Sequence, residues 1–214
     1  MGDPKFARKS YDTPSHPWQG ERIKAEVVLV NQYGLKNKTE VWKAQTIIRK
    51  IRGQSRDLQA RLRGEEKQAE KEAKDLLAKC GRMGLLPLEG VTLNDILILS
   101  EEDILERRLQ TLVFKKGLAT SPKQARQMIV HGHVLMNGHR VTVPGYIVQR
   151  GEELSIEYDP SSPFSDELHP MRASAQEAAN RLAEKEEARA RIEATRAAKA
   201  KADAEEAGIT AEDE

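Results

Sequence analysis

The chain has 214 residues, of which 38% are hydrophobic, 4% aromatic and 32% charged, with a formal net charge of +1. The apolar run from Val27 to Val30 is far shorter than the roughly 20 residues that a membrane-spanning helix needs, and no charged-then-apolar leader opens the chain. Cys80 is the single cysteine, which excludes a disulfide framework and a multi-cysteine zinc site. We therefore expect a soluble cytoplasmic protein with no membrane partner.

The small net charge conceals blocks of opposite sign. Residues 1–82 carry 19 Lys and Arg against 11 Asp and Glu, and residues 104–158 carry eight against four. The segment 83–103 has five acids and no base, and residues 159–214 have 14 acids against eight bases. All eight bases of the second basic block lie within 107–151, where no acid occurs to screen them. Such a stretch is typical of a surface that binds a polyanion rather than of an ordinary solvated face.

The first half of the chain predicts an extended arm and a helical lobe. Residues 1–20 contain three prolines and no apolar period, so they should form a basic arm. Its cations are Lys5, Arg8 and Lys9. A helix should follow and end at Gly34, with a buried face made of Ile23, Val27 and Val30.

A longer, basic amphipathic helix is predicted from about residue 37. Its apolar positions recur at helical spacing and are Val41, Ala44, Ile48, Ile51, Leu58 and Leu62. A third helix over 65–80 is mostly solvated by alternating Glu and Lys. We assign 21–103 to this helical lobe, and we expect the leucine-rich, acidic segment 81–100 to be a connector packed against both halves.

Two capped helices are predicted next. Ser100 should begin the first, because Asp103 can complete a capping box, and the buried stripe up to Gly117 would be Leu105, Leu109, Leu112 and Val113. In the second, Ser121 is the N-cap, Pro122 occupies the first turn, Gln124 completes a capping box and Gly132 ends the helix. One face of this helix should bury Ala125, Met128 and Ile129, and the opposite face should carry Lys123, Arg126 and Gln127.

The periodicity then changes from helix to strand. Residues 134–136 and 139–141 should pair as a hairpin, because Asn137-Gly138 accepts the two positive φ angles of a type I′ turn. Two further short strands are predicted over 146–149 and 153–158. The fold class is therefore α+β, with a compact domain over 104–160 in which two capped helices pack on a short antiparallel sheet. Residues 161–214 form an acidic, alanine-rich tail that we expect to be disordered or a single helix.

Five motifs occur in order along the compact domain. They are ERRLQTLVFKKGLA from Glu106, SPKQARQMIVHGHV from Ser121, NGHRV from Asn137, PGY from Pro144 and GEELSI from Gly151. Together they resemble the small RNA-binding domain first described in the fourth small-subunit ribosomal protein. Two more motifs, EVWKAQTIIRKIR from Glu40 and LLAKCGRMGLL from Leu76, are similar to the archaeal and eukaryotic form of that ribosomal family. The resemblance covers roughly residues 2–160.

The resemblance implies direct binding to small-subunit rRNA and early nucleation of subunit assembly. It also implies contact with neighbouring small-subunit proteins, especially the fifth, and a place near the mRNA entry path that influences decoding accuracy. It implies no cofactor. No catalytic constellation or phosphate-cradling glycine loop occurs in the sequence, so we expect no enzyme. The competing hypothesis is a non-ribosomal RNA-binding stress or regulatory factor that acts on ribosomal particles, and the long basic helical lobe favours the ribosomal protein.

The candidate RNA-binding residues are cations for phosphates and polar or aromatic groups for 2′-hydroxyls and unpaired bases. In the compact domain they are Arg107, Arg108, Lys115, Lys116, Ser121, Lys123, Gln124, Arg126, Gln127, His131, His133, Asn137, Arg140 and Tyr146. In the helical lobe they are Lys43, Arg49, Lys50, Arg52 and Arg56.

Several of these residues have structural alternatives. Ser121 and Gln124 are capping residues first, and Arg107 and Arg108 could pair with the acids of 101–103 one turn back. No third ligand accompanies the pair His131 and His133, so we predict no metal site. Outside the candidate set, we expect Trp18, Tyr33 and Trp42 to pack in the core or between domains rather than to serve as stacking platforms for bases. Cys80 should be a small buried apolar residue.

Overall fold

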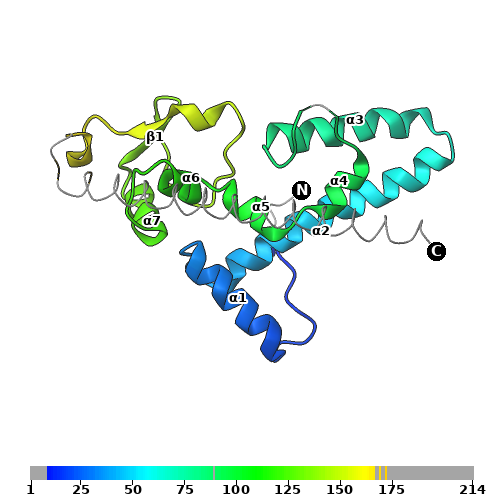
Figure 1. The fold of residues 1–214 in the computed structure, drawn as a ribbon, viewed down its shortest axis with the longest axis horizontal. Helices are drawn as coiled ribbons and strands as arrows, with labels where there is room; N and C mark the ends of the chain where they lie inside the picture. Colours follow the sequence, from blue (N-terminus) through cyan, green and yellow to red (C-terminus); the bar gives the residue numbers. More distant parts are fainter. Residues whose placement is uncertain (1–8, 89, 167–168, 170–171, 173–214) are drawn as a thin grey trace, which may run out of the picture.

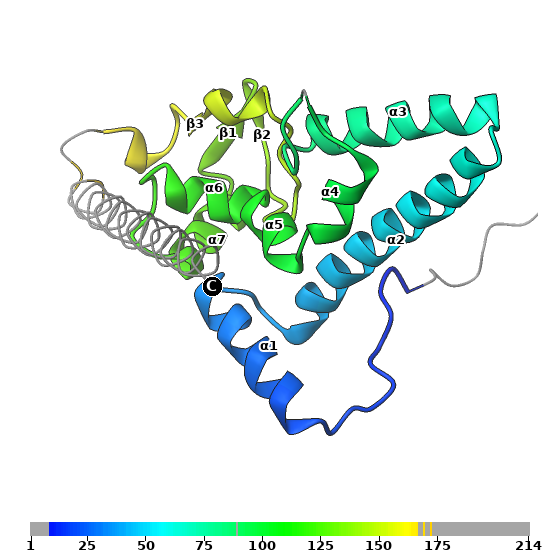
Figure 2. The ribbon, with the colours of Figure 1, turned by 45° about the vertical axis from the view of Figure 1, so that its right-hand side comes forward.

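The computed structural model describes residues 9–88, 90–166, 169 and 172. Figure 1 and Figure 2 show two units side by side, a helical lobe around the long helix α2 and a compact unit that combines helices with a short sheet. The predicted α+β class is confirmed. Two of the predicted arm cations, Lys5 and Arg8, and the predicted tail beyond residue 172 lie outside the described residues.

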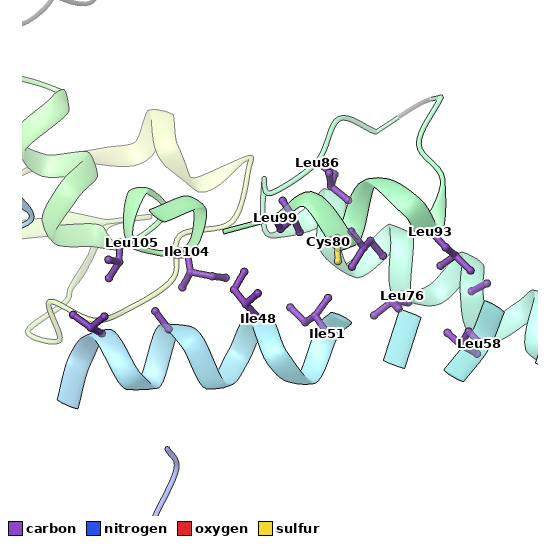
Figure 3. Packing of buried hydrophobic residues seen from close by; sticks show 14 of the residues in the cluster. Ile48, Ile51, Leu58, Leu76, Cys80, Leu86, Leu93, Leu99, Ile104 and Leu105 are labelled. Carbon is purple, nitrogen blue, oxygen red and sulfur yellow. The ribbon is translucent and has the colours of Figure 1, made fainter. Parts of the chain in front are cut away.

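Helix α2 is the spine of the helical lobe, because each of the other helices of the lobe packs against it. The bounds are α1 Gly20–Gln32, α2 Lys38–Arg63, α3 Lys67–Arg82, α4 Leu93–Ile98 and α5 Glu101–Glu106. The predicted stripe of α2 is confirmed: Val41, Ala44, Ile48, Ile51 and Leu58 are buried, and Leu62 is partly buried. Figure 3 shows these side chains meeting residues from α3, α4 and α5 in one core, with Cys80 fully buried among them as expected.

The predicted buried face of α1 is confirmed only in part, since Val30 is partly buried against the core and Ile23 is half-buried. Leu29 and Glu26 are the buried residues of this helix, whereas Val27 is exposed. Glu26 can be buried because Trp42 Nε1 donates to its carboxylate at 3.0 Å and Arg22 and Lys38 lie within salt-bridge distance of it. The face that α1 turns inward is therefore determined by the partners of the Glu26 carboxylate as well as by its apolar side chains. The predicted end of this helix is confirmed, since Gly34 has a φ of +59°.

Trp18 was expected to pack in the core or between domains, and this expectation is wrong. The Trp18 side chain is 90% exposed, ahead of the first turn of α1. Trp42 is half-buried and Tyr33 is buried, as expected.

The connector 81–100 contains a helix that the sequence reading missed. Helix α4 begins with a capping box. The Thr92 side chain accepts from the Asp95 N–H, and the Asp95 carboxylate accepts from the Thr92 N–H at 2.7 Å. Its residues Leu93 and Ile96 are buried against the helical lobe. The spacing of this capping box is the same as that of Ser100 and Asp103, which begin α5 as predicted.

The helix predicted from Ser100 to Gly117 is broken in two. Helix α5 ends at Glu106 and α6 (Leu109–Lys115) begins after the pair Arg107 and Arg108. At the break the backbone pairs with an extended segment, because Leu109 N–H donates to Tyr146 O at 2.8 Å and Val148 N–H donates to Arg107 O at 3.0 Å. The predicted stripe is split accordingly, since Leu105 belongs to the core of the helical lobe and Leu109 to that of the compact unit.

The compact unit packs α6 and α7 (Pro122–Val130) against each other and against a small sheet. Ala125, Met128 and Ile129 of α7 are buried, as predicted. The strands are β1 Val134–Met136, β2 His139–Arg140 and β3 Ile156–Tyr158. The sheet is antiparallel in the order β2-β1-β3, with Met136 opposite His139 on one side and opposite Ile156 on the other.

The hairpin is confirmed, but the two later strands differ from the prediction. Asn137 and Gly138 have φ angles of +52° and +75°, as the type I′ turn requires. The segment 146–149 forms only a single bridge, from Ile147 to Arg108. The strand predicted over 153–158 is shortened to β3, because a 3₁₀ turn occupies Glu152–Ser155.

The first residues of the predicted tail belong to the compact unit. A second 3₁₀ turn, Pro163–Ser165, follows β3, and Phe164 packs against the core of the unit. Ser162 is buried and its hydroxyl lies 2.9 Å from His133 Nδ1. These contacts hold the chain against the compact unit past residue 160.

Candidate RNA-binding surface

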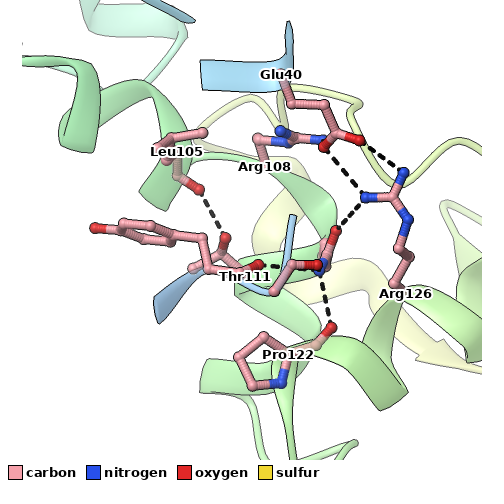
Figure 4. Close-up of polar contacts among 9 residues, drawn as sticks. Glu40, Leu105, Arg108, Thr111, Pro122 and Arg126 are labelled. Atoms are coloured by element: carbon pink, nitrogen blue, oxygen red, sulfur yellow. Dashed lines mark hydrogen bonds and ion pairs between the residues drawn. The ribbon is translucent and has the colours of Figure 1, made fainter. Parts of the chain in front are cut away.

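Glu40 joins the two units. It lies in the first turn of α2, and its carboxylate accepts hydrogen bonds from Arg108 Nη2 at 2.6 Å and Arg126 Nη2 at 2.8 Å, both from the compact unit (Figure 4). The side chains of Glu40 and Arg108 are 13% and 9% exposed. Burial on its own would raise the Glu40 pKa, but the hydrogen bonds and charges of Arg126 and Arg108 outweigh it and hold the pKa below its ordinary value. The carboxylate therefore stays ionised at neutral pH.

Gln110 completes this junction. It is buried in α6, and its Nε2 donates to the carbonyls of Tyr33 at 3.0 Å, Gly34 at 3.0 Å and Pro122 at 2.8 Å. Its Oε1 accepts from Arg126 at 3.3 Å. One amide thus ties the turn between α1 and α2 to the first turn of α7. We call Glu40, Arg108, Gln110 and Arg126 the junction cluster.

Most bases of the acid-free stretch 107–151 pair with carboxylates that lie outside it. Five of its eight bases reach carboxylates that lie before or after it in the chain. The pairs are Arg107–Glu153, Arg108–Glu40, Lys115–Glu106, Arg126–Glu40 and Arg140–Asp159. The stretch cannot be screened by acids of its own, as predicted, but carboxylates from outside it pair with these five bases. The alternative pairing of Arg107 and Arg108 with residues 101–103 is wrong, since their partners are Glu153 and Glu40.

The three remaining bases of the stretch have no carboxylate partner among the described residues. Arg150 Nη2 donates to Leu86 O at 3.0 Å, so its guanidinium forms a second bridge to the helical lobe. Lys116 reaches only Ile156 O at 3.5 Å. Lys123 is exposed on α7 and makes no contact with an acid in the described part of the chain. Lys123 is thus the clearest free cation of the compact unit.

The polar candidates divide into internal and exposed groups. Ser121 caps α7 by accepting from Gln124 N–H at 3.3 Å, and Gln124 accepts from Thr120 N–H at 2.7 Å instead of completing the predicted box with Ser121. The Tyr146 hydroxyl lies 3.2 Å from Glu152, and burial and that carboxylate raise the Tyr146 pKa. His133, as described above, binds Ser162. Gln127, His131 and Asn137 are exposed, although Asn137 N–H donates to Ser155 Oγ at 3.3 Å.

The cations of α2 also divide. Arg52 donates to Leu99 O at the end of α4, and this hydrogen bond links α2 to α4. Arg56 Nε donates to Arg52 O at 3.5 Å. Arg49 is exposed and pairs with Asp12 at 3.0 Å, which holds the described part of the arm along α2. Lys43 and Lys50 are exposed and have no acidic partner within the described residues. Lys43 lines a groove of about 380 Å³ that runs between α2 and the loop 143–147, beside the junction cluster.

The sequence reading missed Glu40 and Gln110. Glu40 is an acid in the first turn of an otherwise basic helix, and this local signal is consistent with helix-dipole pairing alone. Its partners lie 68 and 86 residues away in the sequence, beyond any periodic pattern. Gln110 follows Leu109 in the segment predicted as one continuous helix, which the structure divides into α5 and α6. Neither residue carried a signal of its role in joining the units.

Comparisons with known proteins place the fold in a family. The family model for the S4 domain matches residues 107–154. Proteins called small ribosomal subunit protein uS4 are similar over most of the chain. That of Thermoplasma acidophilum is 49% identical over 187 residues, which is 87% of this chain and 94% of that protein. That of Methanococcus aeolicus is 53% identical over 82% of this chain and 97% of its own length, and that of Sulfurisphaera tokodaii is 51% identical over 83% and 97%.

The chain belongs to the uS4 family. All three of these relatives are archaeal, and the similarity extends beyond the S4 domain into the helical lobe. The resemblance stated from the motifs is therefore confirmed. The S4 match begins at Arg107, where α5 and α6 separate, and it covers most of the compact unit, whose core runs from Leu109 to Ile156. We refer to the compact unit as the S4 domain from here on.

Within the described residues, no group of three or more His, Cys, Asp or Glu is arranged to hold a metal ion. Among the same residues, no helix is both long and apolar enough to cross a membrane.

Proposed function

We propose that the chain is a structural protein of the small ribosomal subunit in the cytoplasm and that it binds small-subunit rRNA directly, without catalysing a reaction. The observation that carries the proposal is that Lys43, Lys50 and Lys123 are exposed and have no acidic partner in the described part of the chain, on two units that the junction cluster holds together. Phosphate contacts by such cations release counterions and supply most of the affinity for RNA. The names of the uS4 relatives support the same proposal.

The proposed contacts form two groups. In the S4 domain, Lys123, Gln127 and His131 lie exposed on or at the end of α7, where they would contact phosphates and unpaired bases. In the helical lobe, Lys43 and Lys50 would contact the phosphate backbone of the RNA, together with Arg49 and Arg56. Asn137 at the hairpin and the exposed side chains of Lys115, Lys116 and Arg140 extend the surface of the S4 domain.

The residues turned inward act on binding through the fold. Arg108 and Arg126 form ion pairs with Glu40, and Arg107 forms one with Glu153. Arg52 donates a hydrogen bond to Leu99 O. The side chains of Ser121, Gln124, His133 and Tyr146 are used in caps and internal hydrogen bonds. We therefore propose that these candidates hold the RNA-binding surface in shape and that the exposed set contacts the RNA.

The finer roles follow from the family. We propose that binding by this chain nucleates assembly of the small-subunit body, and that the folded protein contacts the fifth small-subunit protein. A place near the mRNA entry path would let it influence translational accuracy. The support for these roles is the membership of the uS4 family.

Sedimentation of cell extract through a sucrose gradient tests the proposal. We expect the chain in the small-subunit peak at one copy per subunit, and retained after a wash at moderate salt. Purified protein should also bind a small-subunit rRNA transcript in preference to tRNA of equal mass concentration. A substoichiometric association that salt removes would instead indicate a regulatory factor that visits ribosomal particles, and would contradict a structural role.

A further inference from the structure

The Glu40 carboxylate lies at a junction between two units that are both rich in Lys and Arg. Helix α2 carries eight Lys and Arg against two Asp and Glu, and the stretch of the S4 domain that faces it has no acid of its own. Repulsion between like charges opposes the docking of such surfaces. Glu40 lies between Arg108 and Arg126, and both guanidinium groups come from the opposite unit. Removing this carboxylate would leave two arginines facing each other at the junction.

A contact without charge lies beside these ion pairs. Gly34 has a φ of +59°, and a Cβ added to it would lie 2.8 Å from Pro122 Cβ and 2.9 Å from Lys123 N. The turn after α1 therefore fits the first turn of α7 only because residue 34 has no side chain. Gln110 donates to carbonyls on both sides of this contact. The junction can thus be disturbed with or without a change in charge.

We propose that Glu40 is a positioning residue for RNA binding, which fixes α2 relative to α7 so that one RNA molecule contacts the cations of both units. The inference rests on the proposed function and adds a residue that would not itself touch RNA. Lys43 lies one helical turn after Glu40, and the backbone of Lys123 lies against Gly34; among the described residues neither side chain has an acidic partner. A change in the angle between the units would separate these two groups first.

The sign of the effect of Glu40→Gln distinguishes positioning from simple electrostatics. The substitution removes a negative charge from a protein that binds a polyanion, and it releases two arginines, so electrostatics alone predicts tighter binding. Positioning predicts the opposite, because two linked binding surfaces gain affinity only while both fit the ligand at once.

The experiment measures the affinity of the full-length protein for a small-subunit rRNA transcript at fixed salt. We expect Glu40→Gln to bind about tenfold more weakly or worse than the wild type. Glu106→Gln is the matched charge control, because Glu106 is an exposed acid that pairs with Lys115 at 3.3 Å and is not a member of the junction cluster. It should bind at least as tightly as the wild type.

A second variant disturbs the junction at constant charge. Gly34→Ala should weaken binding as much as Glu40→Gln does, because its Cβ forces the turn away from Pro122. Gly53→Ala, in the exposed middle of α2 with no atom within 4 Å of the added Cβ, is the control and should bind normally.

Energy transfer between two labels reports the position of the units without RNA. Lys71 in α3 and Thr142 after β2 are exposed and suit substitution by cysteine, while the native Cys80 is buried and resists labelling. Both junction variants should broaden the distance distribution relative to the wild type, whereas Glu106→Gln and Gly53→Ala should not. If Glu40→Gln fails to fold, Gly34→Ala decides the question by the same two measurements.

The outcomes are separable. The inference alone is overturned if Glu40→Gln binds as tightly as the wild type or more tightly, or if the distance distribution is unchanged. A wild-type protein that shows no preference for small-subunit rRNA overturns the proposed function, and the inference with it.

Discussion

The guanidinium of Arg107 lies directly over Gly84, in the space that a side chain would occupy. A Cβ added to Gly84 would be 2.6 Å from Arg107 Cζ, and Gly84 has a φ of +70°. In this position Arg107 Nη2 donates to Val148 O at 3.0 Å and pairs with Glu153. The turn after α3 is therefore shaped to admit an arginine of the S4 domain, which gives the two units another contact besides those of Glu40 and Arg150.

Gly84→Ala is expected to destabilise the protein more than its backbone strain explains. The positive φ costs about 1 kcal/mol in a non-glycine residue, and displacement of Arg107 from its carbonyl and carboxylate partners adds a similar amount. Gly90→Ala is the control, because Gly90 has a φ of +73° but no atom lies within 4 Å of an added Cβ. Chemical denaturation of both variants gives the comparison, and equal losses would show that the Arg107 contact contributes nothing.

Lys123→Ala and Arg126→Ala should have opposite phenotypes although both residues were predicted on one face of α7. Lys123→Ala should weaken rRNA binding by about 1 kcal/mol and leave the melting temperature unchanged, because the side chain is exposed and has no acidic partner in the described part of the chain. Arg126→Ala should lower the free energy of unfolding by about 1 to 3 kcal/mol, because it removes one of the two guanidinium partners of Glu40 and the donor to Gln110 Oε1. Thermal melts and filter binding on both variants decide; a stable Arg126→Ala would contradict the junction.

The salt dependence of rRNA binding should report how many lysines of the proposed surface contact phosphates. Each phosphate contact contributes about 0.7 to 0.9 to the slope of log affinity against log salt. The triple variant Lys43→Ala, Lys50→Ala, Lys123→Ala should therefore flatten the slope by about 2 to 3. Replacing three lysines of α3, Lys67, Lys71 and Lys74, is a charge-matched control. If the control flattens the slope equally, binding depends on total charge and not on the proposed surface.

Asp159 should make stability depend on pH in the acid range. Hydrogen bonds from the Ser161 side chain and backbone, followed by that from Arg140, lower the Asp159 pKa from 3.8 to about 2. Because the folded-state pKa is below the unfolded one, the stabilisation is present in full above the unfolded value and is lost as the pH falls toward about 2. Asp159→Asn should therefore be less stable than the wild type near neutral pH, and this difference should shrink on acidification below about pH 4. Denaturation curves at several pH values measure it, and a constant difference would refute the assignment.

Local features of the fold could be predicted from the sequence because they depend on neighbouring residues. The capping pair Ser100 and Asp103, the turn Asn137-Gly138 and the apolar stripe of α2 each concern groups within one or a few turns. The residues Thr92 and Asp95 carry the same kind of signal for the start of α4, but the acidic, leucine-rich composition of the segment 81–100 favours a connector. The break at Arg107 and Arg108 could not be predicted, since the leucine period continues across it while backbone pairing with 146–148 decides the conformation.

The candidate surface was predictable as a set of residue types but not as a division of roles. Lys123 and Arg126 are alike in spacing and charge, yet one is free and the other is bound to Glu40. Exposure of each cation depends on an acid far away in the chain, and the sequence does not say which acid folds back onto which base. Burial of Glu26 misled the reading of α1 for the same reason, because Trp42 and Lys38 of α2 supply its partners.

The separation of Glu40 and Arg126 has a consequence for synthesis. Because 86 residues separate them, α2 leaves the ribosome that makes it well before its partner helix has been translated. Domains generally fold as units during synthesis, the N-terminal one first. The core of the helical lobe ends at Leu105, so all of its residues are synthesised before those of α7. We therefore expect docking of the two units to follow the folding of the helical lobe, and a chain truncated before Arg126 should keep its helices but lack one of the two arginines that hold Glu40.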